Sequence, residues 1–161
     1  MRIGIVGSEG KKFTPETEAY ARALIRDLLH TLDGQVDPTT VVVSGQCHLG
    51  GIDIWSVEEA KALGLDYKEH PPKIHAWEGG YKQRNLEIAL DSDQVVCITL
   101  KVLPPTYTGM TFNLCYHCGT KDHVKSGGCW TTKQARILGK RGYTVALHPD
   151  GTREYVLPRN A

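Results

Sequence analysis

The sequence predicts an α/β protein, in which a mostly parallel sheet lies between two layers of helices. Short runs of β-branched residues alternate with segments of helical periodicity, and glycine-bearing loops follow several of the predicted strands. This alternation is typical of right-handed crossovers between parallel strands, whose loops gather at the carboxyl ends of the strands. We expect a single domain over residues 1–161, with a cysteine- and histidine-bearing insertion at 102–128.

Two units of strand, glycine loop and helix are predicted in the first half of the chain. Thr14 is a favourable N-cap residue, and Pro15 suits the first position of a helix. Apolar residues including Leu32 recur at helical spacing until Gly34 ends this helix. The elements predicted here are strands at 3–6, 39–43 and 65–69, a helix from Pro15 to Gly34, and a helix at 52–63.

The second half continues the alternation on both sides of an irregular segment. Leu86, Ala89 and Leu90 share one face of the next predicted helix, which indicates that this face is apolar. Residues 102–128 have no sustained period and contain two cysteines and two histidines, as expected of a functional insertion. The elements predicted here are helices at 81–90 and 131–138 and strands at 94–100, 143–147 and 154–157, the last two forming a hairpin.

The composition argues against several classes of function. The chain has 19 Lys+Arg and 18 Asp+Glu residues, a net charge of +1. Without a long basic run, we do not expect nucleic-acid binding as its main role. Its apolar runs are far shorter than the ~18 residues that indicate a bilayer span, and its first residues lack the pattern of a signal peptide. We therefore expect a cytoplasmic protein with no membrane segment.

Three glycine-bearing loops, at 7–10, 44–53 and 126–131, are the strongest indication of a binding site. Each precedes a predicted helix, whose first backbone N–H groups and positive dipole end favour an anion, and glycine lets the backbone approach a phosphate closely. None of the loops matches the Walker A or dinucleotide-binding pattern, and each alone is compatible with a structural turn. Three such loops at one edge of a sheet favour nucleotide or phosphate binding.

Individual side chains near these loops suggest how such a ligand is held. Asp53 suits a ribose hydroxyl or a metal-bound phosphate, although the helix dipole also favours an acidic residue there. Arg84 has the planar fork that binds phosphate in a bidentate manner, but arginines on helices also form surface ion pairs. Trp55, Trp77 and Tyr81 are candidates for stacking on a base, although aromatic residues more often belong to the core or to a subunit interface. The segment His75-Ala76-Trp77, in the predicted loop 71–80, is the better candidate.

A second group of residues has the composition of a metal site. Cys115 and Cys118 are separated by two residues, so both thiolates can bind one tetrahedral ion, and His123 and Cys129 follow within reach of a folded loop. We predict a structural zinc site from these four residues, with His117 competing with His123 and with free thiols as the alternative. Cys129 also lies in the third glycine loop, so a bound metal would hold the shape of that loop.

The order and spacing of three segments resemble those of a known protein family. Residues 43–53 resemble its first phosphate loop, and residues 127–131 resemble its second glycine loop. Arg84-Asn85, followed by Ser92-Asp93 and the strand at 95–98, is similar to its Arg-Asn helix and the strand after that helix. The family is the SLOG superfamily, a Rossmann-like group that includes the Lonely Guy proteins and the core of DNA-processing protein A. The resemblance implies a three-layer Rossmann-like fold and a nucleotide pocket, and members of the group often pair as homodimers.

The resemblance also implies which residues form the pocket. Lonely Guy proteins cleave the N-glycosidic bond of nucleoside 5′-monophosphates with an arginine, matched by Arg84, and a glutamate, whose position is taken by Gln134. Trp130 replaces a small glycine of that branch, which narrows the pocket or offers a stacking face. The residues implied to bind the nucleotide are Gly7, Ser8, Ser44, Gly45, Gly50, Gly51, Asp53, Arg84, Asn85, Gly127, Gly128, Trp130 and Thr131.

Three functions fit these observations. The first is binding of a small-molecule nucleotide or nucleotide derivative beside a structural zinc site. The second is hydrolysis of a nucleoside monophosphate, with Arg84 and Gln134 in the catalytic positions, but a glutamine cannot act as a base or stabilise an oxocarbenium-like transition state by charge. The third is a zinc-containing interaction or nucleic-acid-binding module in which the glycine loops are only structural, and the near-neutral charge does not favour it.

Overall fold

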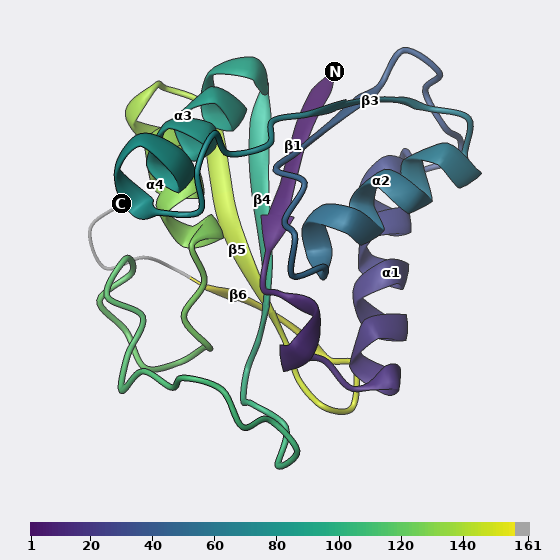
Figure 1. Cartoon of the computed structure of the whole chain (residues 1–161). Helices are drawn as coiled ribbons and strands as arrows, with labels where there is room; N and C mark the ends of the chain where they lie inside the picture. Colours follow the sequence, from purple (N-terminus) through teal and green to yellow (C-terminus); the bar gives the residue numbers. More distant parts are fainter. Residues whose placement is uncertain (157–161) are drawn as a thin grey trace.

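A single six-stranded sheet forms the centre of the protein in the computed structural model, which describes residues 1–156 (Figure 1). The strand order is β3-β2-β1-β4-β5-β6; the first five strands are parallel and the last pair is antiparallel. The strands are β1 (Arg2–Gly7), β2 (Val41–Ser44), β3 (Asp66–Glu69), β4 (Gln94–Leu100), β5 (Arg141–Leu147) and β6 (Arg153–Val156).

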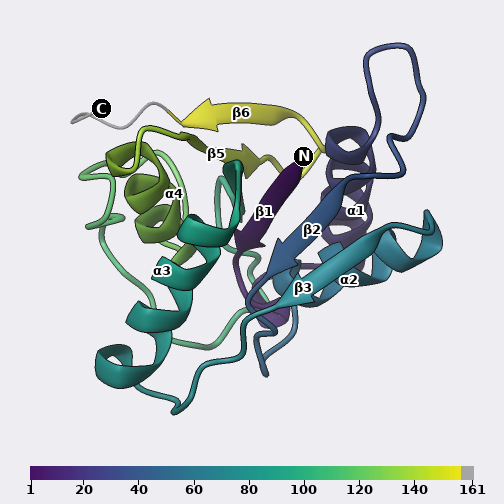
Figure 2. The same ribbon diagram turned by 90° about the horizontal axis from the view of Figure 1, so that it is seen from above.

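Helices cover both faces of the sheet, which makes the fold a three-layer, Rossmann-like α/β arrangement. Figure 2 shows α1 and α2 on one side and α3 and α4 on the other. The helices are α1 (Pro15–Leu29), α2 (Ile52–Ala62), α3 (Lys82–Asp91) and α4 (Gly128–Ile137), with a 3₁₀ turn η1 (Gly10–Lys12) and a π-helical turn η2 (Trp77–Tyr81). No helix within residues 1–156 combines the length and apolar character that a membrane crossing requires.

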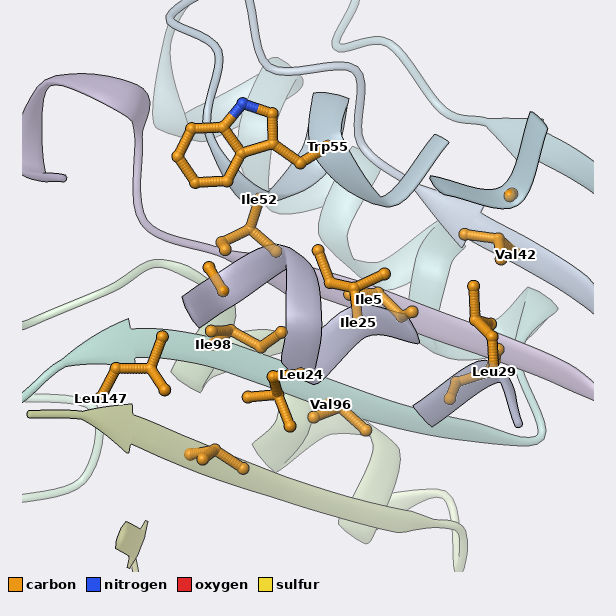
Figure 3. Close-up of a cluster of buried hydrophobic side chains, with 14 of the residues drawn as sticks. Ile5, Leu24, Ile25, Leu29, Val42, Ile52, Trp55, Val96, Ile98 and Leu147 are labelled. Carbon is orange, nitrogen blue, oxygen red and sulfur yellow. The ribbon is translucent and has the colours of Figure 1, made fainter. Parts of the chain in front are cut away.

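Alternating side chains of the parallel strands form two cores. Ile5 and Ile98 point to the side of α1 and α2, where Ile25 and Trp55 pack (Figure 3). Val6, Val95 and Cys97 lie on the opposite face with Ile88 of α3 and Ala135 of α4. Near-continuous apolar strands of this kind are expected where a parallel sheet is covered on both faces.

The connections place the candidate loops at one end of the sheet. The chain moves outward from β1 to β2 and β3, returns to β4 beside β1, and then continues through β5 to β6 at the opposite edge of the sheet. This reversal leaves a crevice outside the carboxyl ends of β1 and β4, the place where open α/β sheets bind ligands. The loops after β1, β2 and β4 all end there, and the long insertion lies at the same end, below the strands in Figure 1.

The predicted end of the first helix was wrong. Helix α1 ends at Leu29, the next residue is already extended, and the side chain of Leu32 is fully exposed. The Thr31 hydroxyl accepts a hydrogen bond from the Gln35 backbone N–H at 3.1 Å. This local bond offers the backbone an alternative to the helix, which is the usual reason that threonine favours turns.

The predicted apolar face of the third helix was wrong for Leu86 and Leu90 and correct for Ala89. Leu86 and Leu90 are exposed, whereas Arg84, Asn85, Ile88 and Ala89 are buried. The buried face of α3 therefore carries two polar residues, and hydrophobic periodicity alone could not identify it. Other boundaries differ by a few residues: α4 begins at Gly128 instead of residue 131, and β5 begins at Arg141 instead of residue 143. The turn η2 occupies part of the loop predicted at 71–80. Leu157, the last residue of the predicted strand 154–157, lies outside the described residues.

We expect substitutions in and just after α1 to distinguish core residues from surface residues. Ile25→Ala removes a fully buried side chain and should lower the free energy of unfolding by about 2–5 kcal/mol. Leu32→Ala should change it by less than about 0.5 kcal/mol, because Leu32 is exposed. Urea denaturation of both variants measures this, and an equal loss in the two would place Leu32 in the core.

Candidate functional site

A cavity of about 510 Å³ lies in the crevice at the carboxyl ends of β1 and β4. Its walls come from the loop after β1, the loop after β2, η2, the first turn of α3, the middle and the C-terminal end of the insertion, and the first turn of α4. A volume of this size is ordinary for a small-molecule site. Eight residues predicted to bind a nucleotide line it: Gly7, Ser8, Asp53, Arg84, Asn85, Gly127, Gly128 and Thr131.

A buried ion pair lies at one side of this cavity. Arg84 Nη1 is 3.9 Å from Asp53 Oδ2, and both side chains are 8% exposed. Arg84 also donates hydrogen bonds to the Gly45 carbonyl and, at 2.7 Å, to Asn85 Oδ1, and its guanidinium lies over the ring of Tyr81. Burial raises the pKa of Asp53 to about 6, although Arg84 acts against the shift. The arginine is thus held rigidly where its charge faces the carboxyl group.

The first turn of α4 forms the opposite side of the cavity. Ser126 Oγ accepts a hydrogen bond from the Gly128 N–H at 3.1 Å, and Gly128 packs so closely that a Cβ there would lie 2.6 Å from Cys97 Sγ. Thr131 lines the cavity and is fully buried, yet its hydroxyl has no hydrogen-bond partner within residues 1–156. A buried unpaired hydroxyl costs free energy, so this one needs a partner that the protein does not supply.

Aromatic rings and two lysines complete the lining. His48 stacks on His75 with 4.0 Å between ring centroids, and Trp77 packs edge-on against Trp130 at 5.2 Å. Trp77 lines the cavity, as its predicted stacking role requires, whereas Trp130 supports it from behind. The remaining lining residues are Val6, Glu9, Lys12, Cys47, His48, Leu49, Tyr81, Tyr116, His117, Lys125 and Ser126.

Five further residues predicted from the sequence lie behind the cavity wall or outside it. Ser44 Oγ donates to the Asp53 carbonyl at 2.6 Å, and the Gly45 carbonyl accepts from Arg84, so both position the ion pair. Gly51 has a φ of +88° and lies against the backbone of Ser8, where a Cβ would clash. Gly50 and Gln134 also lie outside the lining.

The predicted metal ligands form a compact cluster beside the cavity. The four ligand atoms of Cys115, Cys118, His123 and Cys129 lie within 4.8 Å of one another, and all four residues are buried. Ligand atoms about 2.3 Å from one tetrahedral ion lie about 3.8 Å apart. A small movement of these four atoms towards one another would therefore let them all bind one zinc ion. The structure thus contains a Cys₃His group that can hold a metal ion, with His123 and not His117 as its histidine.

Local geometry prepares this cluster for a metal. Asp122 Oδ1 lies 2.7 Å from His123 Nδ1, which turns Nε2 towards Cys129 Sγ at 3.7 Å. A carboxylate in this position is the usual outer partner of a metal-bound histidine. Hydrogen bonds among the three thiols hold the pKa of Cys115 well below its usual range and raise the pKa values of Cys118 and Cys129, so a bound metal would displace the protons of the latter two.

Comparisons with known proteins do not identify a relative. The chain matches no protein-family model, no curated protein and no solved structure. The candidate site is therefore defined by its geometry: a cavity with an ion pair at one side, a helix N-terminus at the other, and a Cys₃His group next to that helix.

Two neighbouring glycines at the start of α4 should respond differently to substitution. Gly128→Ala places a methyl group against Cys97 and Val6 and should lower the free energy of unfolding by about 1–3 kcal/mol. Gly127→Ala meets no atom within 4 Å and has a helical φ of −60°, so we expect a change below about 0.5 kcal/mol. Thermal unfolding of both variants measures the difference, and equal midpoints would contradict the close packing of Gly128.

Proposed function

We propose that this protein binds a nucleotide or nucleotide derivative in the cavity, and that a structural zinc ion in the Cys₃His group supports the binding site. The observation that carries the nucleotide proposal is the buried, unpaired hydroxyl of Thr131 beside the N-terminus of α4. A phosphate oxygen at this position would accept its hydrogen bond and interact favourably with the helix dipole. Lys12 and Lys125 add positive charge to the same cavity.

The rest of the cavity suits the other parts of a nucleotide. Asp53 offers carboxylate oxygens to ribose hydroxyls, and Arg84 fixes the position of that carboxylate. Trp77, held by Trp130, offers a ring face to a base. This distribution of an anion site, a hydroxyl site and an aromatic wall supports the resemblance to the SLOG superfamily, whose members would carry a pocket at this point of the fold.

Binding without hydrolysis is the version of this function that we favour. Arg84 lines the cavity, but Gln134, the other candidate for catalysis, does not. Glu58 and Glu87 do not replace the missing glutamate, because Glu58 pairs with Arg22 and Glu87 lies beside His70, and neither lines the cavity. The lining acids are Asp53, which is paired with Arg84, and Glu9.

Zinc is the metal that best suits the Cys₃His group. Three cysteines and one histidine form a closed structural site with no position left for a water molecule. Such a site needs reduced thiols, which supports the expected cytoplasmic location. Its role would be to hold the insertion and the first turn of α4 around the cavity, because Cys129 follows Gly128 directly in the chain.

Removing the Thr131 hydroxyl should weaken nucleotide binding. Thr131→Val keeps the shape of the side chain but cannot donate to a phosphate, and we expect AMP to bind on the order of tenfold more weakly by calorimetry. Thr132→Val is the matched control, because the Thr132 hydroxyl already donates to the Cys129 carbonyl at 2.8 Å and lies outside the lining. Its affinity for AMP should stay within about twofold. A wild-type protein that binds no nucleotide would refute the proposal.

The purified protein should contain about one zinc ion per chain, a ratio that follows from the single Cys₃His group. Elemental analysis measures this ratio. Cys118→Ser removes one thiolate ligand and should lose the metal and unfold at a lower temperature. Cys47→Ser is the control, because Cys47 lies outside the group, and it should keep its zinc. Equal zinc content in both variants, or none in the wild type, would contradict the assignment.

A further inference from the structure

Lys12 and Lys125 lie where two hollows of the surface meet. Both lysines line the main cavity, and both also line a second hollow of about 240 Å³ beneath the insertion. Lys12 Nζ lies 3.5 Å from the Lys125 carbonyl, which brings the two residues together across 113 positions of sequence. The proposed phosphate site at α4 does not account for the second hollow.

These two ammonium groups are poorly neutralised by the protein. Within residues 1–156, the lysines in ion pairs are Lys82 and Lys101, and neither Lys12 nor Lys125 has a carboxylate within 4 Å. Lys125 Nζ lies over the rings of Phe112 and Tyr116, at 4.6 and 5.0 Å from their centroids. Burial lowers the pKa of Lys12, and the charge of Lys125 lowers it further, against the opposing effect of Glu9. An anion that contacts both lysines would offset the repulsion between them.

This second anion position is continuous with the first. Lys125 directly precedes Ser126 and Gly127, which lead into α4, so Lys125 and the helix N-terminus lie along one stretch of backbone, with Lys12 beside them. Thr131 of α4 lines the main cavity together with both lysines. A ligand with two linked phosphates can therefore reach both positions at once.

Besides Lys12 and Lys125, the second hollow is lined by other polar residues, including Lys101 and Lys121, and by a group of apolar side chains. These apolar side chains come from the insertion and include Val102, Leu103, Met110, Phe112 and Leu114. Several are exposed to solvent in the free protein, with Met110 74% and Val102 55% exposed. A flat ring system on the far side of a diphosphate would cover this surface, and Phe112 offers it an aromatic neighbour.

We propose that the ligand is a dinucleotide, with its diphosphate held between the N-terminus of α4 and the Lys12–Lys125 pair and its second ring system in the hollow lined by Phe112. This inference depends on the proposed nucleotide function, because it extends a ligand whose first nucleotide occupies the main cavity. It assigns the lysine pair to the diphosphate and the insertion to the half of the ligand that a mononucleotide lacks.

Calorimetry with AMP, ADP and NAD tests the proposal on the full chain. We expect NAD to bind on the order of 100-fold more tightly than AMP, with ADP between them, because the diphosphate adds charge-assisted contacts to two lysines. The K12M/K125M variant should weaken NAD binding at least about tenfold more than it weakens AMP binding, so that most of the advantage of NAD over AMP is lost. The K61M/K68M variant is the control for net charge, because Lys61 and Lys68 are exposed on α2 and β3 and line neither hollow.

The outcomes distinguish the dinucleotide proposal from the broader proposal of nucleotide binding. AMP binding with no gain for NAD would overturn the dinucleotide proposal and leave nucleotide binding intact. ADP binding as tightly as NAD would overturn the role of the apolar hollow. An NAD advantage that survives in K12M/K125M would overturn the role of the lysine pair. The absence of binding by all three compounds would refute the nucleotide function itself.

Discussion

The close contact between Gly128 and the sheet is the constraint on which the functional end of this protein depends. Helix α4 approaches β1 and β4 so closely that a methyl group at this position would meet Cys97 and Val6. The contact sets the direction of the first turn of α4, from which Thr131 faces the cavity and Cys129 enters the Cys₃His group. Ser126 completes the turn by accepting the Gly128 N–H. One turn of helix therefore contributes residues to both sites.

The buried Arg84–Asp53 pair shows a second constraint, which is electrostatic. Burying two charges costs more than exposing them unless the geometry is favourable, and a pair 3.9 Å apart compensates only partly. The protein adds the Gly45 carbonyl, Asn85 and the ring of Tyr81 around the arginine. A helix face with this composition departs from the apolar pattern that packing alone would select, and such departures concentrate at functional sites.

The sequence predicts those features of the structure that depend on residues close together in the chain. Strand and helix periodicity identified the alternating elements, and the spacing of Cys115, Cys118, His123 and Cys129 identified the metal group, because short loops can bring closely spaced ligands together. The polar face of α3 was missed because hydrophobic periodicity cannot recognise a buried arginine. Lys125 and Tyr116 were missed because the path of the insertion has no period and depends on distant contacts, and Lys12 was missed because it meets Lys125 only in the folded chain. One such contact is the hydrogen bond from Val124 N–H to the Leu100 carbonyl at 2.8 Å.

The same hydrogen bond gives the insertion a particular shape. Val124 returns to the end of β4 where the insertion leaves it, so the intervening segment forms a closed loop on the rim of the cavity. A metal ion joining Cys115 and Cys118 to His123 and Cys129 would divide this long loop into shorter ones and reduce the entropy lost when the loop closes. Loss of the metal would then disorder the loop on the rim of the cavity and leave the sheet folded. In a cell that lacks zinc, the protein would keep its core, but proteases could cleave the disordered loop.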